Sequence, residues 1–164
     1  MQSMEEIYQA HAQTVYRYLL SLTRDSDLAE ELTQEVFYQA VKNSSRFDGS
    51  CKVSTWLCAI AKNQLHVYRR KHPPTAPLEP ELQTAPSSEH DVLARIRTVE
   101  LLKKIHALDP DKREILHLRL FGNLSFREIG DVLGHTENWA RVMYYRGREI
   151  LKKELRSDEA EAEL

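Results

Sequence analysis

Residues 125–150 read SFREIGDVLGHTENWARVMYYRGREI, and this stretch is typical of a helix-turn-helix. Ser125 and Glu128 form an S-x-x-E capping box, which predicts the start of a first helix. Gly134 falls where the chain must turn, because glycine tolerates the positive φ that ends many helices. Thr136 follows it and can cap a second helix. The stretch therefore predicts two helices joined by a tight turn.

The second helix of this motif, over about 137–153, is rich in basic side chains. They are Arg141, Arg146, Arg148, Lys152 and Lys153. A helix with this charge fits the major groove of DNA. An ordinary helical hairpin on a protein surface is the alternative that the pattern alone leaves open.

The composition is that of a soluble, all-helical protein. Of the 164 residues, 41% are hydrophobic, 29% are charged and only 5 are glycines. The formal net charge is −2, so a nucleic-acid site requires basic residues gathered into patches. The start, MQSMEEIYQAHAQ, lacks the features of a signal peptide, and no stretch approaches about 18 uncharged apolar residues. We therefore expect a cytoplasmic protein without membrane insertion, in which Cys51 and Cys58 are reduced thiols.

Residues 72–90 read HPPTAPLEPELQTAPSSEH and divide the chain in two. Most of the prolines lie here, and the stretch holds no Lys or Arg. Such a segment cannot continue a helix and buries little, so it predicts a flexible linker with a reach of at most about 60 Å. The expected architecture is two small helical domains, 1–71 and 91–155, followed by an acidic, frayed tail over 156–164.

The first domain should hold three helices, over about 4–22, 27–43 and 53–71. The second of these has an apolar stripe that includes Phe37 and Val41, and its first half carries only acidic charges. Those acids are Asp25, Asp27, Glu30, Glu31 and Glu35. They form either a solvated face or a dock for the basic surface of a partner.

The helix over 53–71 is basic in its C-terminal half, where cations alternate with polar and aromatic side chains. The cations are Lys62, Arg69, Arg70 and Lys71. The helix dipole explains part of this charge, and the alternation suits a nucleic-acid face. In the loop before the helix, an exposed Phe47 can stack on an unpaired base, an attraction worth about 1–3 kcal/mol. The alternative is that Phe47 and Trp56 are packing residues.

The second domain should begin with a helix from Asp91 to about His106. Pro110 opens the next helix, with Asp109 as its cap, and a Gly122-Asn123 turn follows. The apolar residues expected to pack in these two helices are Val92, Ile96, Val99, Leu102, Ile105, Ile115, Leu116, Leu118 and Leu120.

Three stretches occur in the order DLAEELTQEVFYQAVKN, RFDGSCKVSTWLCAIAKNQLHVYRR and LSFREIGDVLGHTENWARVMYYRGREIL. Together they resemble bacterial RNA polymerase sigma factors of the extracytoplasmic-function (ECF) group, within the sigma-70 family. The resemblance covers nearly all of the chain outside the linker and the tail. It implies an all-α fold, in which a sigma2-like domain of three to four helices and a sigma4-like helix-turn-helix domain are joined by a flexible linker.

The resemblance assigns residues 1–71 to polymerase docking and to recognition and melting of the promoter −10 element. The acidic helix would bind the clamp helices of the polymerase β′ subunit through Asp27, Glu30, Glu31, Gln34 and Glu35. The −10 contacts would be Phe47, Asp48, Gly49, Ser50, Trp56, Lys62, Asn63, His66, Arg69 and Arg70. Asn63 offers a donor and an acceptor to a base edge, and the loop over 47–52 would hold a flipped base.

The resemblance assigns residues 91–155 to the −35 element. The contacts would be Thr136, Glu137, Asn138, Trp139, Arg141, Val142, Tyr145, Arg146 and Arg148. Arg141 is the best candidate for a base edge, with Arg146 and Arg148 on phosphates. The chain departs from the family's pattern in several places: Asp48 stands where arginine is common, Val53 where phenylalanine is common, His135 where an aliphatic residue is common, and Asn138-Trp139-Ala140 in place of G-T-V.

The resulting expectation is an alternative sigma factor that binds core RNA polymerase, its β flap included, and directs promoter-specific initiation. An anti-sigma factor is a further expected partner. No catalytic residue, cofactor or metal is expected, because the histidines are scattered and no H-E-x-x-H or C-x-x-C pair occurs. The alternative is a stand-alone helix-turn-helix repressor or activator, which should dimerise and protect a palindrome without polymerase.

Overall fold

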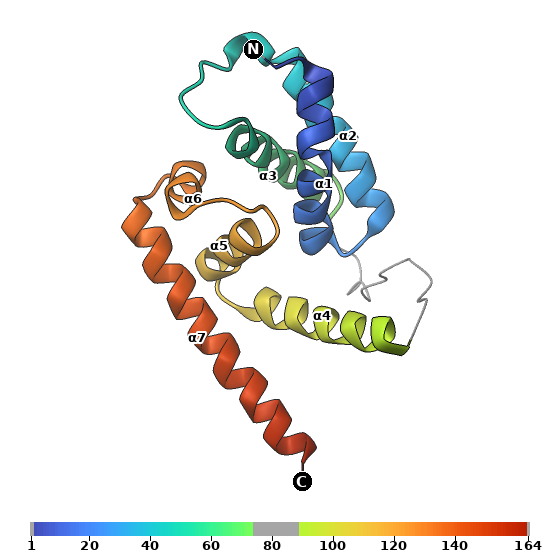
Figure 1. Ribbon diagram of the computed structural model, residues 1–164, viewed down its shortest axis with the longest axis vertical. Helices are drawn as coiled ribbons and strands as arrows, with labels where there is room; N and C mark the ends of the chain where they lie inside the picture. Colours follow the sequence, from blue (N-terminus) through green and yellow to red (C-terminus); the bar gives the residue numbers. More distant parts are fainter. Residues whose placement is uncertain (1, 74–88, 164) are drawn as a thin grey trace.

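A computed structural model of the chain consists of helices joined by turns and loops in the parts that it describes, residues 2–73 and 89–163 (Figure 1). The description includes the side chains of these residues except those of 89–93 and 95. The expected all-α fold is confirmed. None of the described helices is both long enough and apolar enough to cross a membrane.

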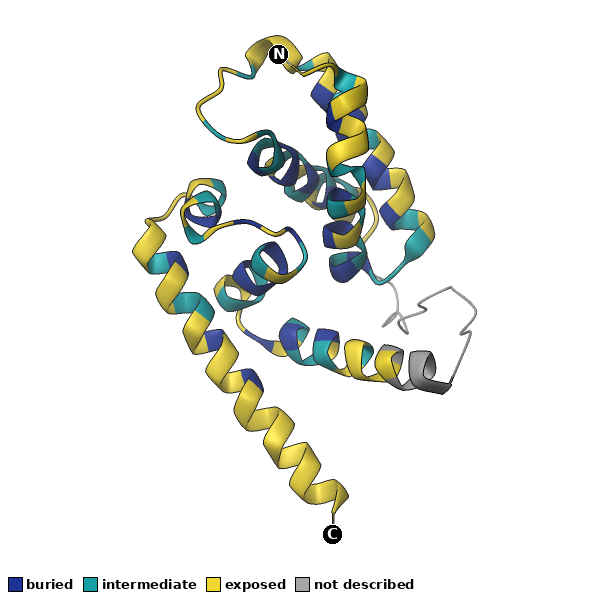
Figure 2. Ribbon diagram, viewed as in Figure 1, coloured by how far each residue is buried: buried dark blue, intermediate teal, exposed yellow. Residues whose placement is uncertain are grey.

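The first domain packs α1 (Met4–Thr23), α2 (Ser26–Lys42) and α3 (Val53–Lys71) around one core, with a 3-10 turn at Ser44–Arg46. α2 begins after Asp25, whose carboxylate accepts hydrogen bonds from two backbone N–H groups of the first turn. Apolar side chains from all three helices fill the core, which Figure 2 shows as the buried inner faces. They include Val15, Leu19, Leu32, Val36, Phe37, Leu57, Cys58 and Leu65.

The second domain consists of α4 (Glu89–Ala107), α5 (Pro110–Leu120), α6 (Phe126–Leu133) and α7 (Glu137–Ala162). α4 starts two residues before the expected position, and residues 74–88 of the predicted linker lie outside the described part of the chain. Asp109 caps α5, which has proline in its first turn, as expected. Between α4, α5 and α7, a small core forms from Ile105, Leu108, Leu116 and Leu151.

The helix-turn-helix forms as its sequence predicts. Ser125 and Glu128 make a reciprocal capping box at the start of α6. Gly134 ends that helix with a φ of 74°, and Thr136 caps α7. At Gly130, a β-carbon would lie 2.7 Å from a backbone oxygen of the turn, so only glycine allows this approach. The angle between α6 and α7 is therefore set by backbone contact.

Some apolar residues expected in the core are exposed instead, namely Val41, Ile96 and Leu120. The inward stripe of α2 runs through Val36 and Ala40, which turns Val41 away from the core. Ile96 precedes the part of α4 that packs against α5, and Leu120 is the last residue of α5. The side chain of Val92 lies outside the described part of the chain.

The expectation of a frayed C-terminal tail is wrong. α7 continues without a break to Ala162, so the second helix of the helix-turn-helix and the tail are one helix (Figure 1). The tail is rich in alanine and glutamate, which are strong helix formers. In addition, Lys104 of α4 forms an ion pair with Asp158 at 2.6 Å. The side chains of the tail are nevertheless exposed (Figure 2).

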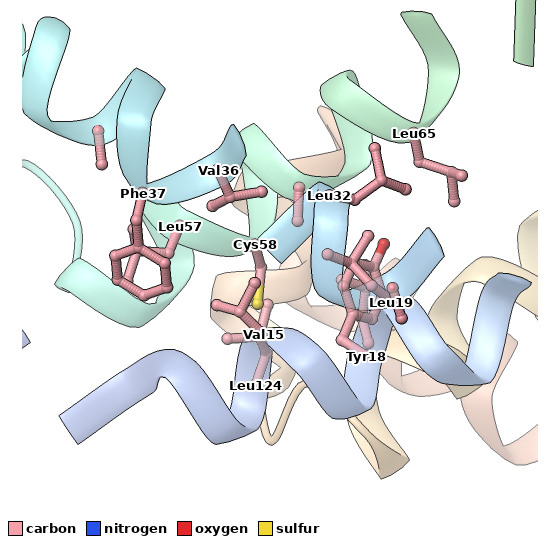
Figure 3. Packing of buried hydrophobic residues seen from close by; sticks show 14 of the residues in the cluster. Val15, Tyr18, Leu19, Leu32, Val36, Phe37, Leu57, Cys58, Leu65 and Leu124 are labelled. Carbon is pink, nitrogen blue, oxygen red and sulfur yellow. The ribbon is translucent and has the colours of Figure 1, made fainter. Parts of the chain in front are cut away.

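The two domains pack against each other, because α5 contacts α1 and α6 contacts α3. Leu118, Leu124 and Ile129 of the second domain are fully buried in the same cluster as the core of the first. Figure 3 shows Leu124 among the side chains of this cluster, near Val15 and Cys58 of the first domain. The described domains thus share a continuous apolar core.

A buried hydrogen bond joins the domains at this contact. The Oγ of Ser21 in α1 and the Nδ1 of His117 in α5 lie 2.9 Å apart. The Ser21 hydroxyl donates its only proton to the carbonyl of Tyr18 at 2.6 Å, so Nδ1 of His117 must be the donor to Ser21. The Nε2 atom of the fully buried ring is then an acceptor without a partner among the described residues.

Burial, together with the positive charges of His106, Arg113, Arg69 and Arg24, lowers the pKa of His117 to about 3. A proton added at Nε2 would have no acceptor and would meet these nearby cations. The imidazole is therefore neutral in the folded protein at neutral pH.

We expect the free energy of unfolding to fall as the pH drops below about 6.5, the ordinary pKa of histidine. Below this pH the unfolded chain binds a proton at position 117 and the folded chain does not. Protons then favour unfolding by up to about 1.4 kcal/mol per pH unit.

Urea denaturation between about pH 7.5 and about pH 5.5 measures how steeply the free energy of unfolding depends on pH. His117→Asn keeps a donor for Ser21 without titrating and should flatten it. An equal slope in both proteins would assign the pH dependence to other groups.

Candidate functional site

The outer face of α2 carries the acidic residues expected to dock a partner. Ala29, Leu32 and Val36 take the inward positions of the helix and are buried. The residues on the opposite side are all exposed: Asp27, Glu30, Glu31 and Gln34. Glu35 lies at the edge of this face, where it is half-buried and accepts a hydrogen bond from Gln39 at 2.9 Å. The structure therefore brings the four exposed residues together and sets Glu35 apart.

Two apolar side chains extend this face toward the end of α2. Tyr38 is 61% exposed and Val41 is 53% exposed. They follow Gln34 at spacings of four and three residues, which keeps all three on one side of the helix. Sequence reasoning placed Val41 in the core and did not single out Tyr38. In the sequence, only the helical spacing of Tyr38 and Val41 from the acidic residues could have indicated that they lie on this face.

The loop before α3 is held in a defined shape. An Oδ1 atom of Asp48 accepts a hydrogen bond from the backbone N–H of Ser50 at 2.9 Å. Gly49 between them has a φ of 76°, a conformation that favours glycine. Hydrogen bonds from the side chain and backbone of Ser50 lower the pKa of Asp48. At neutral pH this carboxylate can therefore accept a hydrogen bond from the amino group of a base, whereas it would repel a phosphate.

Phe47 and Trp56 form an aromatic pair at the start of α3. Their ring centroids lie 4.9 Å apart with the planes tilted by 33°, and both residues are half-buried. The sequence left open whether these residues pack or contact a base. The geometry allows both, because each ring packs on the other and keeps part of its surface open. The pair lies next to Asp48 in the chain, at the edge of the same loop.

One face of α3 carries exposed polar and basic side chains. Asn63, His66 and Arg70 share this face at spacings of three and four residues. Lys62 is half-buried beside it. Arg69 differs from the others, because its Nη2 donates to the carbonyl of Leu22 at 3.1 Å and so holds the end of α1. The structure therefore assigns Arg69 a packing contact that its sequence position did not indicate.

The first turns of α7 present a second polar face. Glu137, Asn138, Arg141, Tyr145 and Arg148 are exposed on it, and Val142 lies at its edge. Nη2 of Arg141 pairs with Oε1 of Glu137 at 3.0 Å. The guanidinium of Arg141 also lies 5.6 Å from the centroid of the Phe126 ring in α6. Two contacts thus orient the arginine on the outer side of the helix.

Three other residues predicted for this face, Thr136, Trp139 and Arg146, differ from one another in their contacts. The Thr136 hydroxyl caps α7, so its oxygen accepts from the backbone N–H of Trp139 at 3.1 Å. Trp139 is half-buried and stacks on His135, with ring centroids 3.6 Å apart. Arg146 is exposed at the edge of the face, beside a shallow hollow that extends to Lys112 and Lys153. Sequence reasoning missed Lys112 because this residue lies on α5, far away in the chain.

The described residues include no group of three or more His, Cys, Asp or Glu side chains arranged to hold a metal ion. The chemistry of both polar faces is that of hydrogen bonding and charge. α3 offers an amide, an imidazole and a guanidinium beside an aromatic pair, and α7 offers an arginine on the outside of a helix-turn-helix. These are the groups that contact phosphates, base edges and stacked bases.

Comparison with known proteins supports this interpretation across most of the chain. The family model for Sigma-70 region 2 matches residues 7–73, and that for Sigma-70 region 4 matches residues 98–151. The ECF RNA polymerase sigma factor SigM of Bacillus subtilis is 33% identical over 156 residues, which cover 92% of this chain and 93% of SigM. The RNA polymerase sigma factor CarQ of Myxococcus xanthus is 29% identical and covers 92% of this chain and 88% of its own length.

The fold also matches a solved structure. The sigma factor RpoE of Bartonella quintana, crystallised with the anti-sigma factor NepR, superposes with a TM-score of 0.69. The alignment covers 94% of this chain and 97% of that chain at 18% identity, so it supports the fold alone. The family itself is shown by the two family models and by the identity to SigM. The chain belongs to the ECF sigma factors of the sigma-70 family, alternative sigma factors that direct transcription initiation.

Proposed function

We propose that the outer face of α2 docks this sigma factor on core RNA polymerase, at the clamp helices of the β′ subunit. Support comes from four exposed polar residues on one side of a well-capped helix, three of them acidic. Opposite charges across an interface speed association and select the partner. Tyr38 and Val41 add apolar surface at the end of the same face, and burying such surface stabilises a complex.

α3 and the loop before it read the −10 element in this proposal. Asn63 contacts a base edge, His66 and Arg70 lie along the strand, and Lys62 binds a phosphate. The loop residues Phe47, Asp48, Gly49 and Ser50, with Trp56, hold a base that has left the stack. Stacking on an aromatic ring is worth about 1–3 kcal/mol, which offsets much of the cost of unstacking. Arg69 contributes by holding α1 against α3.

α7 reads the −35 element from the major groove. The observation that carries this proposal is Arg141, which projects from the first turns of a helix-turn-helix and is oriented by Glu137. An arginine that donates two hydrogen bonds to guanine discriminates that base by about 1–3 kcal/mol. Arg146 and Arg148 would bind phosphates, and Lys112 and Lys153 lie close enough to the same hollow to add to them.

The remaining partners follow from the same function. The second domain would also contact the β flap of polymerase. An anti-sigma factor would hold the protein inactive, as suggested by the complex of the similar sigma factor RpoE with the anti-sigma factor NepR. The protein acts in the cytoplasm, where polymerase and promoters are. It supplies recognition and strand opening, and polymerase makes the bonds, so the sigma factor needs no catalytic residue of its own.

Reversing the charge of the α2 face should abolish polymerase binding. In the triple variant Asp27→Lys, Glu30→Lys and Glu31→Lys, the face would repel a basic partner surface while the buried side of α2 is unchanged. Co-migration with core polymerase on native gels measures binding, and run-off transcription measures function. The matched control reverses Glu159 and Glu161 of α7 and Glu163 directly after it, with the same change in net charge. Full activity of the α2 variant would exclude this face as the docking site.

Removing the side chain of Arg141 should weaken and relax −35 recognition. We expect Arg141→Ala to lower initiation by roughly tenfold or more, because a bidentate base contact is worth about 1–3 kcal/mol. On a promoter library randomised at the −35 element, the variant should lose its preference at one base pair. Arg148→Ala is the comparison, and it should weaken all promoters alike. If Arg141→Ala kept the wild-type preference at every position, another residue would be the reader.

A further inference from the structure

The first turns of α7 carry two side chains of opposite charge that are joined on the exposed face of the helix. Nη2 of Arg141 donates to Oε1 of Glu137 at 3.0 Å. About half of each side chain is open to solvent, 46% for Arg141 and 51% for Glu137. The two side chains therefore face outward together, on the face that is proposed to read the −35 element.

Glu137 lies at the end of the helix that meets base edges. It is the first residue of α7, directly after the capping residue Thr136. The N-terminal residues of a recognition helix contact bases in the major groove. An acidic residue at this position is also favoured by the positive end of the helix dipole. The dipole accounts for an acid at position 137, and the contacts of its carboxylate determine what else this residue can do.

The ion pair leaves polar atoms free on both side chains. Oε2 of Glu137 has no hydrogen-bond partner among the residues that the structure describes. A guanidinium has several N–H donors, and the bond to Glu137 uses only one of its N–H groups. The ring of Phe126, with its centroid 5.6 Å from Cζ of Arg141, gives the guanidinium a further contact. Arg141 can therefore donate two hydrogen bonds to a base while it stays paired with Glu137.

The charge of the carboxylate limits what Glu137 can contact on DNA. A carboxylate repels phosphates, and it can only accept hydrogen bonds. In the major groove the donors are the amino groups of cytosine and adenine. The pairing with Arg141 neutralises the carboxylate, which lowers the cost of bringing it between the two phosphate backbones. A base amino group is therefore the DNA partner that fits Glu137.

Together, the two side chains are complementary to the major-groove edge of a G·C pair. That edge presents two acceptors, N7 and O6 of guanine, followed by the amino donor N4 of cytosine. Arg141 offers two donors, and Glu137 offers an acceptor beside them. An A·T pair presents a donor next to N7, and the acceptor O4 of thymine in place of the cytosine amino group. It would therefore oppose a donor of Arg141 with a donor and the carboxylate with an acceptor.

We propose that Glu137 is a specificity-determining residue of the −35 face: its carboxylate accepts a hydrogen bond from N4 of the cytosine that is paired with the guanine read by Arg141. This inference rests on the proposed function of Arg141 and adds a second reader for the same base pair. The ion pair thus reads both strands at a single position of the −35 element.

The first test compares two variants in the assembled complex with core polymerase. On a promoter library randomised at the −35 element, Arg141→Ala and Glu137→Ala should weaken the preference at the same G·C pair. We expect a loss of roughly fivefold or more for Glu137→Ala, because one hydrogen bond to a charged group is removed. Folding should be preserved, since alanine is a strong helix former and the cap at Thr136 does not involve the Glu137 side chain.

The matched control is Glu149→Ala, which removes another exposed glutamate of α7 that is paired with a neighbouring cation, Lys152. It changes the net charge equally and should leave the preference at every position unchanged. The same loss of preference in the control would mean that charge near the DNA is sufficient, and the proposal would be overturned.

A change of one chemical group in the DNA separates reading by Glu137 from support of Arg141. The cytosine of the identified pair is replaced by 2-pyrimidinone, which lacks only the amino group. The loss of binding should be roughly fivefold larger for the wild-type complex than for the Glu137→Ala complex, which has no carboxylate to accept from that group. Equal losses in both complexes would assign the effect to the DNA duplex and would overturn the proposal.

These outcomes also separate this inference from the proposed function. Loss of the preference in Arg141→Ala but not in Glu137→Ala would keep Arg141 as the reader and overturn the role of Glu137. Unchanged preferences in Arg141→Ala would refute the proposed function of Arg141 and, with it, the shared reading of one base pair.

Discussion

The apolar contact made by Leu118, Leu124 and Ile129 determines where both nucleic-acid faces lie. Each of these side chains is fully buried, and burying one leucine or isoleucine contributes about 1.5–3 kcal/mol. The ion pairs of Lys52 and Lys62 are partly exposed and contribute at most about 1 kcal/mol each. The apolar contact therefore holds the domains together, and the ion pairs add little to its strength.

The three proposed functional surfaces differ in how exposed they are in this arrangement. The acidic face of α2 is exposed, and so is the Arg141 face of α7. Lys62 of the proposed −10 face is paired with Glu114 of the other domain, and Lys52 at the start of α3 is paired with Glu128.

Local sequence signals predicted the helices and most of their ends. The capping box at Ser125, the glycine at position 134 and the cap at Thr136 all formed, because each depends only on neighbouring residues. Contacts between distant segments were not predictable in this way. Nothing near Leu124 or His117 in the sequence indicates a contact with the first domain, because that contact forms only when α5 packs beside α1. Packing between helices likewise determines the exposure of Val41 and the hydrogen bond from Arg69 to Leu22. The helical tail forms because α7 continues past the end of the helix-turn-helix motif.

The central claim is that the two reading domains are packed together in the free protein and apart on a promoter. Spin labels at Ala59→Cys in α3 and Asp111→Cys in α5, in a Cys51→Ser background, report the distance between the domains by pulsed electron paramagnetic resonance. The free protein should give one short, narrow distribution, and the complex with core polymerase and promoter DNA should give a distribution longer by tens of ångströms. The same short distance in both samples would contradict the account.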